Sequence, residues 1–307
     1  MSIVSPSTPS ARSSASGPSS APRLERRSGG MSNKPSILTT GILLIGAAYC
    51  LFPVLWVVIA STKSSSELFS TFTLAPSVHL FENIGDLFAY RDGLFLRWGW
   101  NTVLYAVGGA AVSTFVSAAA GYGLAKYDFR GKQLFFSAIL AGVLLPAVIL
   151  AIPQYLLFAK IGLTDTYWAV FLPSILSPYG IYLSRIYAGA AVPTEMIEAA
   201  RTDGAGDVRI FWQFGIPMML PGLVTIFLFQ FVGIWNNYML PYIMLGDDGL
   251  FPITVGLSTL LNQGSSQPAM YTTVITGSLV AILPLIALFF VLQRYWQVDL
   301  AAGATKG

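Results

Sequence analysis

The chain has 307 residues, of which 54% are hydrophobic and 10% charged, and its mean hydropathy is +0.66. This much apolar surface excludes an ordinary water-soluble fold and makes a bilayer the expected solvent. The net charge of +3 comes without a basic patch interleaved with aromatic residues, so nucleic-acid binding has no support. One cysteine and one histidine exclude an intramolecular disulfide and indicate no redox or metal chemistry.

The first 35 residues are rich in Ser, Pro and Arg and almost free of apolar side chains. Such a segment buries too little surface to offset the entropy of ordering, so we expect a disordered tail. The apolar run that follows has two interpretations, a first membrane span or a signal peptide with a lipoprotein cleavage site at Cys50. Bulky Tyr49 before the cysteine, and apolar sequence continuing through Val58, favour an uncleaved span.

Six apolar runs are long enough to cross the hydrocarbon core as helices, which takes about 20 residues. None has Asp, Glu, Lys or Arg in its middle. They lie at roughly 36–60, 101–124, 134–159, 166–187, 216–238 and 271–293. Pro146 and Pro153 are expected to kink the third. The apolar run 251–261 is too short to cross alone and is predicted to be re-entrant or interfacial.

The basic residues predict the orientation of these spans. With the N-terminus in the cytoplasm, all of the 17 Lys and Arg except Lys63, Arg91, Arg97 and Lys160 fall on the cytoplasmic side. Both termini are therefore expected to be cytoplasmic. The predicted domains are a disordered cytoplasmic tail at 1–35, a six-helix transmembrane domain at 36–293 and a second cytoplasmic tail at 294–307.

The inner loop 192–217 is expected to form two short helices. Thr194 can cap the first, Gly204 can supply the left-handed turn that ends it, and Asp207 can begin the second. Pro217 is tolerated in the first turn of the next span. Local physics also allows a simple solvated connection between two spans.

The surface of this loop is suited to docking into a cleft. Ala199 and Ala200 allow close approach, and Glu198 and Asp203 can pair with basic groups on a partner. Met196 and Ile197 offer apolar contact. We therefore expect a rigid lever on the cytoplasmic side.

Residues Glu198-Ala199-Ala200, Gly204, Phe214 and Ile216-Pro217 stand at the spacings of a known motif. The loop resembles the EAA loop of the permeases of ABC importers. In that family the loop forms a coupling helix that fits a cleft in a cytoplasmic ATPase subunit. The resemblance implies this coupling role for Glu198, Ala199, Ala200, Asp203 and Gly204.

The resemblance covers most of the chain after residue 36 and is to the maltose-type carbohydrate branch of these permeases. The segments that carry it are Asn101-Thr102, Ala119 to Lys126 with Gly131-Lys132, Pro153-Gln154, Gly162 to Thr166, Trp235-Asn236 and the end of the chain from Ala301 to Gly307. In the family this short tail reaches the ATPase interface, and residues Gln297 to Leu300 depart from its common version.

The resemblance implies an all-α integral membrane protein of the type I, MetI-like architecture with six transmembrane helices. It also implies its partners: a second permease subunit, two ATP-binding subunits that hold ATP and Mg, and an extracytoplasmic solute-binding protein that delivers carbohydrate. The expected location is a prokaryotic inner or plasma membrane. No cofactor, metal site or catalytic residue is expected in the chain itself.

The source of energy for transport gives an independent argument for a separate ATPase subunit. The spans carry no ionisable group of the kind that ion-coupled carriers use, and the chain has no Gly-x-x-x-x-Gly-Lys-Ser/Thr phosphate loop. A separate ATPase is therefore expected. The alternatives are a secondary transporter or channel subunit and a membrane-embedded enzyme. Neither explains the 192–217 loop, and the enzyme also lacks a cluster of acid, base or metal groups.

Two further features have open interpretations. Gln230, Trp235, Asn236, Asn237 and Tyr238 at the end of the fifth span can hydrogen-bond and stack on sugars, or can anchor the helix at the membrane interface. The small-residue runs 108–111 and 118–121 allow close helix packing, either against a second permease or within this chain.

Overall fold

The computed structural model describes residues 37–70, 74–264 and 266–304, with side chains up to residue 293. This part of the chain is helical and has no strand. The predicted disordered tail at 1–35 lies outside the described residues. The chain divides into two units at Tyr49 and Cys50, so α1 (Ile37–Ala60) begins in the first and ends in the second. The following description concerns the unit from Cys50 onward.

Four helices in the described ranges are long and apolar enough to cross a membrane, and they coincide with the first, second, fifth and sixth predicted spans. They are α1, Leu94–Lys126, Asp207–Trp235 and the Ala269–Gln293 part of α15 (Ala269–Ala304). The second joins α4 (Leu94–Val103), a π-helical turn at Leu104–Gly108 and α5 (Gly109–Lys126). The fifth joins α11 (Asp207–Ile210), a π-helical turn at Phe211–Gly215 and α12 (Ile216–Trp235).

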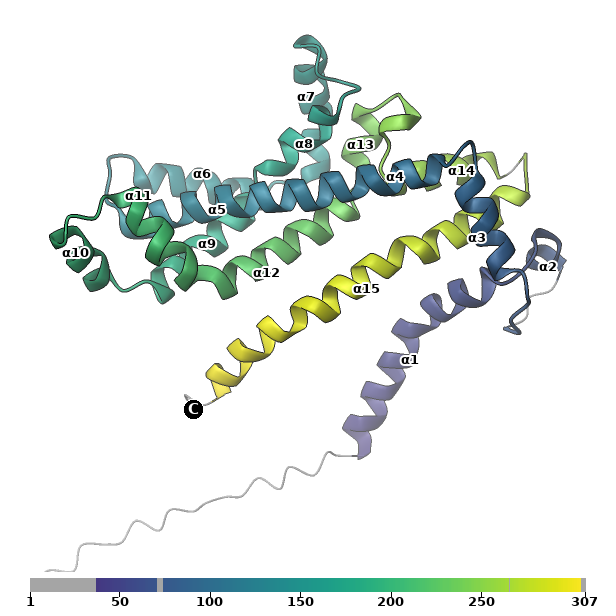
Figure 1. Cartoon of the computed structure of the whole chain (residues 1–307), viewed down its shortest axis with the longest axis horizontal. Coiled ribbons are helices and arrows are strands. Elements are labelled where there is room, and N and C mark those ends of the chain that lie inside the picture. The colour runs from purple at the N-terminus through teal and green to yellow at the C-terminus, as the bar shows by residue number, and fades with distance from the viewer. Residues whose placement is uncertain (1–36, 71–73, 265, 305–307) are drawn as a thin grey trace, which may run out of the picture. The chain divides into compact units, whose positions relative to one another are not determined.

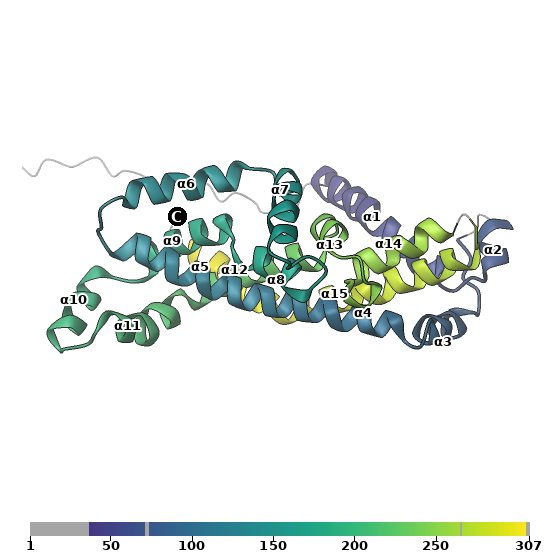
Figure 2. The same cartoon turned by 90° about the horizontal axis from the view of Figure 1, so that it is seen from above.

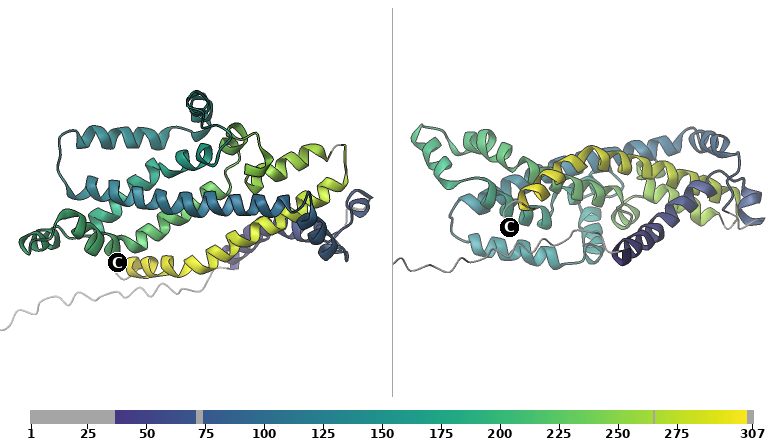
Figure 3. Two further views of the ribbon diagram at one scale, coloured as in Figure 1. Left: turned by 45° about the horizontal axis from the view of Figure 1, so that its top comes forward. Right: turned by 90° about the horizontal axis from the view of Figure 1, so that it is seen from below.

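The third predicted span is two helices, α6 (Lys132–Leu144) and α7 (Ala147–Lys160), which meet at a bend of 105°. The break contains Pro146, and the residue before a proline is disfavoured in the helical region. Leu145 is accordingly extended, with ψ 123°. The kink predicted at Pro146 is confirmed, whereas α7 continues through Pro153. Helix α6 packs on α9, and in Figures 1 and 3 α7 turns away from the direction of α6.

The fourth predicted span is also divided, into α8 (Tyr167–Ile175) and α9 (Pro178–Ala191). Ser177 caps α9 by accepting a hydrogen bond of 3.0 Å from the Gly180 amide, and Pro178 occupies the first turn. The described helices thus give four spans, or five if α6 and α7 count as one. The number six stays a prediction.

Shorter helices complete the described structure. They are α2 (Ser65–Ser70), α3 (Leu80–Ala89), α10 (Thr194–Thr202), α13 (Met239–Met244), a 3-10 turn at Asp248–Leu250 and α14 (Ile253–Gln263). The short apolar run predicted not to cross alone is α14, which packs on α15 and α4. In Figure 2, α10 and α11 lie at one end of the unit and α3 and α14 toward the other.

Among the described helices, α5 and α9 share an extensive and close contact. A Cβ built on Gly121 would lie 2.4 Å from the Ser184 Cβ, and one built on Gly180 would lie 2.6 Å from the Ser117 Oγ. The helices therefore run in the same direction, with small residues spaced by four on the facing sides. Part of the small-residue runs 108–111 and 118–121 packs within the chain. Gly108 approaches Phe171, Gly109 approaches Ile234, and Ala110 and Ala118 are buried. Ala111 and Ala119 are exposed.

Candidate functional site

Helix α10 is held to the bundle by its inner face. Ile197 and Ala200 are 3% and 8% exposed and pack in one cluster with Tyr122 of α5 and Met219 of α12. Both side chains are covered by the chain itself, so neither is open to a partner in this structure, and the coupling role of Ala200 stays a prediction. Their burial fixes α10 to the helices that cross the membrane.

The outer face of α10 is open. Glu198, Ala199, Asp203 and Gly204 are all exposed, and Met196 is half-buried. Gly204 adopts the left-handed conformation predicted for it, with φ +82°, and the Ala205 amide donates to the Ala200 carbonyl at 2.9 Å. Four of the five predicted coupling residues thus lie on one accessible surface, and Ala200 lies beneath it.

The start of α10 differs from the prediction. Thr194 is the first helical residue, and no side chain caps the helix. Pro193 precedes it with φ −66° and ψ 139°, a conformation that its ring favours. Asp207 begins α11 as predicted.

Arg201 is a residue of this site that sequence reasoning did not single out. Its Nε and Nη2 donate to Asp207 Oδ1 at 3.1 and 3.0 Å, and its guanidinium lies 5.5 Å from the centre of the Tyr127 ring at the end of α5. The hydrogen bond to Asp207 raises the pKa of Arg201, and burial raises the pKa of Tyr127. Arg201 thereby ties α10 to both α11 and α5.

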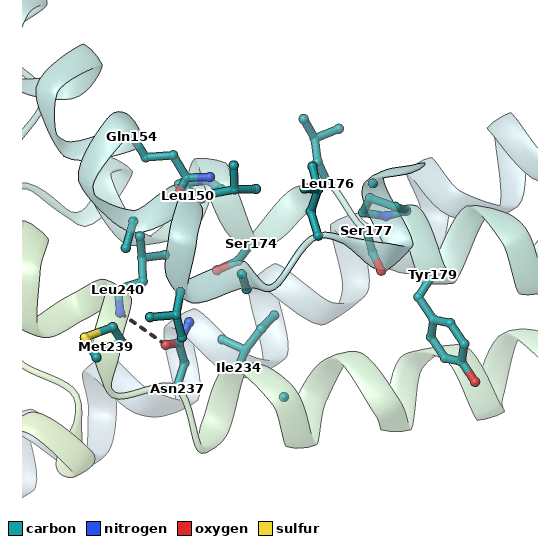
Figure 4. Close-up of a pocket in the computed structure, with 18 of the residues that line it drawn as sticks. Leu150, Gln154, Ser174, Leu176, Ser177, Tyr179, Ile234, Asn237, Met239 and Leu240 are labelled. Carbon is teal, nitrogen blue, oxygen red and sulfur yellow. Dashed lines mark hydrogen bonds between the residues drawn. The ribbon is translucent and has the colours of Figure 1, made fainter. Parts of the chain in front are cut away.

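A second candidate site is a cavity of about 400 Å³ among α6, α7, α8, α9 and α12. Figure 4 shows Gln154, Ser174, Ser177 and Asn237 around it. Gln230 also lines the cavity. Of the predicted path residues, the structure brings Gln230 and Asn237 to this cavity.

The other three predicted path residues line a different cavity. Trp235, Asn236 and Tyr238 border a space of about 390 Å³ shared with α14 and α15. Trp235 is only 5% exposed and packs on Phe231 with ring centres 5.3 Å apart. The five residues therefore do not form one site.

Within the described residues no group of three His, Cys, Asp or Glu is placed to hold a metal ion. A family model described as a binding-protein-dependent transport system inner membrane component matches residues 113–298, which include α10 and the cavity. The chain belongs to this family. It is a permease subunit of an ABC importer, in agreement with the resemblance given by the EAA loop.

Individual relatives extend the match over nearly the whole permease. An arabinooligosaccharide transport permease of Halalkalibacterium halodurans is 34% identical over 284 residues, which cover 90% of this chain and 100% of the relative. A lactose transport permease of Rhizobium radiobacter is 34% identical over 85% of this chain and 93% of its own. A chain of a bacterial ABC transporter involved in the import of the acidic polysaccharide alginate superposes with a TM-score of 0.74 and 26% identity, covering 84% of this chain and 95% of that one.

At the other end of the permease, Asn101 fixes the loop that follows α13. Asn101 is fully buried, and its Nδ2 donates to the carbonyls of Gly249 and Phe251 at 2.9 and 3.1 Å. Its Oδ1 accepts a hydrogen bond of 2.9 Å from the Tyr167 hydroxyl. A buried amide with all these bonds made is costly to replace, because each partner would be left unsatisfied.

Asp165 holds the same loop from a second side. Its Oδ1 accepts hydrogen bonds from the amides of Gly246 and Asp247 at 2.8 and 2.9 Å. Asp165 and Asn101 both belong to the segments that carry the family resemblance. Their role in fixing residues 246–251 was not evident from sequence, since the partners lie about 80 and 150 positions away.

Proposed function

We propose that this permease imports a carbohydrate that an extracytoplasmic solute-binding protein delivers. It does so through a pore formed with a second permease subunit. Two ATP-binding subunits, which hold the ATP and Mg, drive the cycle through α10. The carbohydrate assignment is supported by the arabinooligosaccharide and lactose permeases among the relatives. The location proposed is a prokaryotic inner or plasma membrane, with both termini and α10 in the cytoplasm.

The observation that carries this proposal is the two-sided character of α10. One face is buried against α5 and α12, and the opposite face presents Glu198, Ala199 and Asp203. When a partner displaces α10 through its exposed face, the membrane helices packed on the buried face move with it, because packed cores shift as units. An exposed carboxylate beside a small side chain suits a basic, closely fitting cleft.

The test is charge reversal on the open face. Glu198→Lys is expected to reduce ATP-dependent uptake of radiolabelled arabinotriose or lactose at least tenfold, while membrane insertion is unchanged. The measurements are uptake in cells that lack the native gene and co-purification of the ATP-binding subunits with a tag on this chain.

Asp128→Lys is the matched control. Asp128 is fully exposed at the same end of the unit and pairs only with Lys132, four residues on, among the described residues. It is expected to leave uptake within about twofold, since an exposed pair of this kind contributes little. Normal uptake by the Glu198→Lys variant would refute the coupling role.

A further inference from the structure

Three helix breaks meet at the cavity of about 400 Å³ described above. They are Leu145–Pro146 between α6 and α7, Leu176–Ser177 between α8 and α9, and the residues around Asn237 between α12 and α13. The first two fall near the middle of predicted spans. At membrane depth, non-helical backbone is tolerated only where protein covers it or where it lines a water-filled cavity. Here all three breaks contribute residues to one cavity wall.

Side chains that line the cavity leave hydrogen-bonding groups available. The side-chain amides of Gln154 and Gln230 make no hydrogen bond within the described part of the chain. Asn237 uses its Oδ1 to accept from the Leu240 amide at 3.4 Å, as Figure 4 shows, and its Nδ2 has no partner among the described residues. Amide groups that both donate and accept suit a ligand that carries many hydroxyls.

Gly180 lets polar groups from three elements approach one point beside the cavity. A Cβ on Gly180 would lie 3.1 Å from both Gln230 Nε2 and Ser177 Oγ, and 2.6 Å from Ser117 Oγ. The Ser117 hydroxyl is fully buried and has no hydrogen-bond partner in the described ranges. A side chain at position 180 would therefore crowd the side-chain amide of Gln230, which lines the cavity.

The cavity wall is uncharged. None of its lining residues is Asp, Glu, Lys, Arg or His. An anion that left water for this wall would lose its hydration without gaining a counter-charge, whereas a neutral polyhydroxyl compound would exchange water for amides and hydroxyls. Membership of the family does not decide between these ligands, because the structurally similar transporter imports an acidic polysaccharide.

We propose that the cavity where these breaks meet binds an uncharged carbohydrate during translocation, with Gln154 and Gln230 as its hydrogen-bonding residues. The proposal rests on the proposed function and narrows its substrate class. The volume lies within the range of about 300–1,000 Å³ that is usual for small-molecule sites.

The experiment uses the assembled importer, purified through a tag on this chain, and two matched photoreactive trisaccharides. Both carry one diazirine, and they differ only at one C6 carbon, which is a hydroxymethyl group in the neutral probe and a carboxylate in the anionic probe. After irradiation, labelled peptides are quantified by mass spectrometry. The neutral probe is expected to label peptides within 142–154, 173–180 and 230–240 at least tenfold more than the anionic probe.

Variants identify the residues that bind the probe. Gln154→Leu and Gln230→Leu preserve approximate size and remove the amide, so each is expected to lower labelling by the neutral probe roughly two- to tenfold. Gln133→Leu is the matched control, because Gln133 is exposed on α6 and does not line the cavity. Its labelling is expected to equal that of the unaltered importer. Co-purification of the partner subunits shows that each variant is assembled.

The outcomes separate this inference from the proposed function. Equal labelling by the two probes overturns the neutral assignment. Absence of label from the three peptides, while ATP-dependent uptake of arabinotriose or lactose persists, overturns the site but leaves carbohydrate import standing. Absence of ATP-dependent uptake of any carbohydrate overturns the proposed function and this inference with it.

Discussion

Arg201 connects three elements through one side chain, and its effect on transport is expected to exceed its effect on stability. Its contacts with Asp207 and Tyr127 are at an exposed position, where ion pairs contribute little to the free energy of unfolding. They do, however, set the position of α10 relative to α5 and α11. Arg201 thus positions α10, the helix that we propose for coupling.

Arg201→Ala is expected to lower the number of solute molecules imported per ATP hydrolysed by about threefold or more, with little change in thermal unfolding temperature. The measurements are paired uptake and ATPase assays on proteoliposomes. Arg209→Ala serves as the control, because Arg209 bonds only to Gln213 in the continuing helix among the described residues. A fall in unfolding temperature equal to that of a core variant, or an unchanged transport ratio, would contradict a positioning role.

His79 gives a titration that can be assigned without ambiguity, since it is the only histidine in the chain. Its Nδ1 lies 2.9 Å from Glu82 Oε2, and this hydrogen bond raises the pKa of His79. The folded state therefore favours the protonated ring. The stabilisation is fully present below the ordinary histidine pKa of about 6.5 and is lost as pH rises through the higher folded value.

NMR of histidine-labelled protein in nanodiscs is expected to give a pKa for His79 above that of a free histidine peptide. Glu82→Gln should move the midpoint back toward the peptide value. A midpoint that is the same in both proteins would show that Glu82 does not interact with the ring in solution.

At the scale of the helix, the contact between α5 and α9 depends on the absence of a side chain at Gly121. A Cβ there would lie 2.4 Å from Ser184 Cβ and 2.6 Å from the Arg185 amide nitrogen, and backbone cannot move aside cheaply. Gly121→Ala is expected to destabilise the fold by about 1–3 kcal/mol, the usual range for overpacking. Thermal unfolding of the purified protein in detergent measures the change.

Gly123→Ala is the control for helix propensity. No atom lies within 4 Å of a Cβ at Gly123, two residues along the same helix. Replacing glycine by alanine within a helix is otherwise stabilising by about 0.5–1 kcal/mol. The two variants should therefore shift the unfolding temperature in opposite directions, and equal shifts would refute the close contact.

How far the sequence predicts these elements depends on what each pattern contains. Hydropathy places α1, α5, α12 and α15 because crossing a bilayer requires length and apolarity, and these are properties of one segment alone. A hydropathy profile does not show where the chain changes direction, so it predicts the third span as a single kinked helix. Pro146 marks its break, and Pro178, at the start of α9, marks the break within the fourth span.

The candidate site shows the same limit. Spacing predicts the exposed residues Glu198 and Asp203 and the turn at Gly204, which are local features. It does not predict the burial of Ile197, because that requires α5 and α12 to lie beside α10. Nor does it predict the grouping of Gln154 with Gln230, whose helices are brought together only in the folded chain.

For the whole molecule, the orientation in the membrane is the property that the proposed function requires. α10 must face the ATP-binding subunits, and α3, toward the other end of the unit, must face outward. The chain has a single cysteine, Cys50, so a cysteine-free background needs one substitution, Cys50→Ala. Exposed positions for labelling are available at Glu198 and Asp86.

In this background, the Asp86→Cys variant is expected to react with a membrane-impermeant maleimide in intact cells. The Glu198→Cys variant should react only after the membrane is permeabilised. Gel-shift detection of a large maleimide measures both. Labelling of the Glu198→Cys variant in intact cells would place α10 outside and reject the importer mechanism for this chain.

The unbroken Leu94–Lys126 helix has a mechanical consequence. Its 33 residues span about 50 Å. Near one end Asn101 hydrogen-bonds to the loop after α13, and near the other end Tyr122 packs in one cluster with residues of α10. With α10 in the cytoplasm, as proposed, we expect a displacement of α10 to reach the opposite side of the membrane along this one helix. The π-helical turn at Leu104–Gly108 is an irregular stretch within it, and we expect any bending of the helix to occur there.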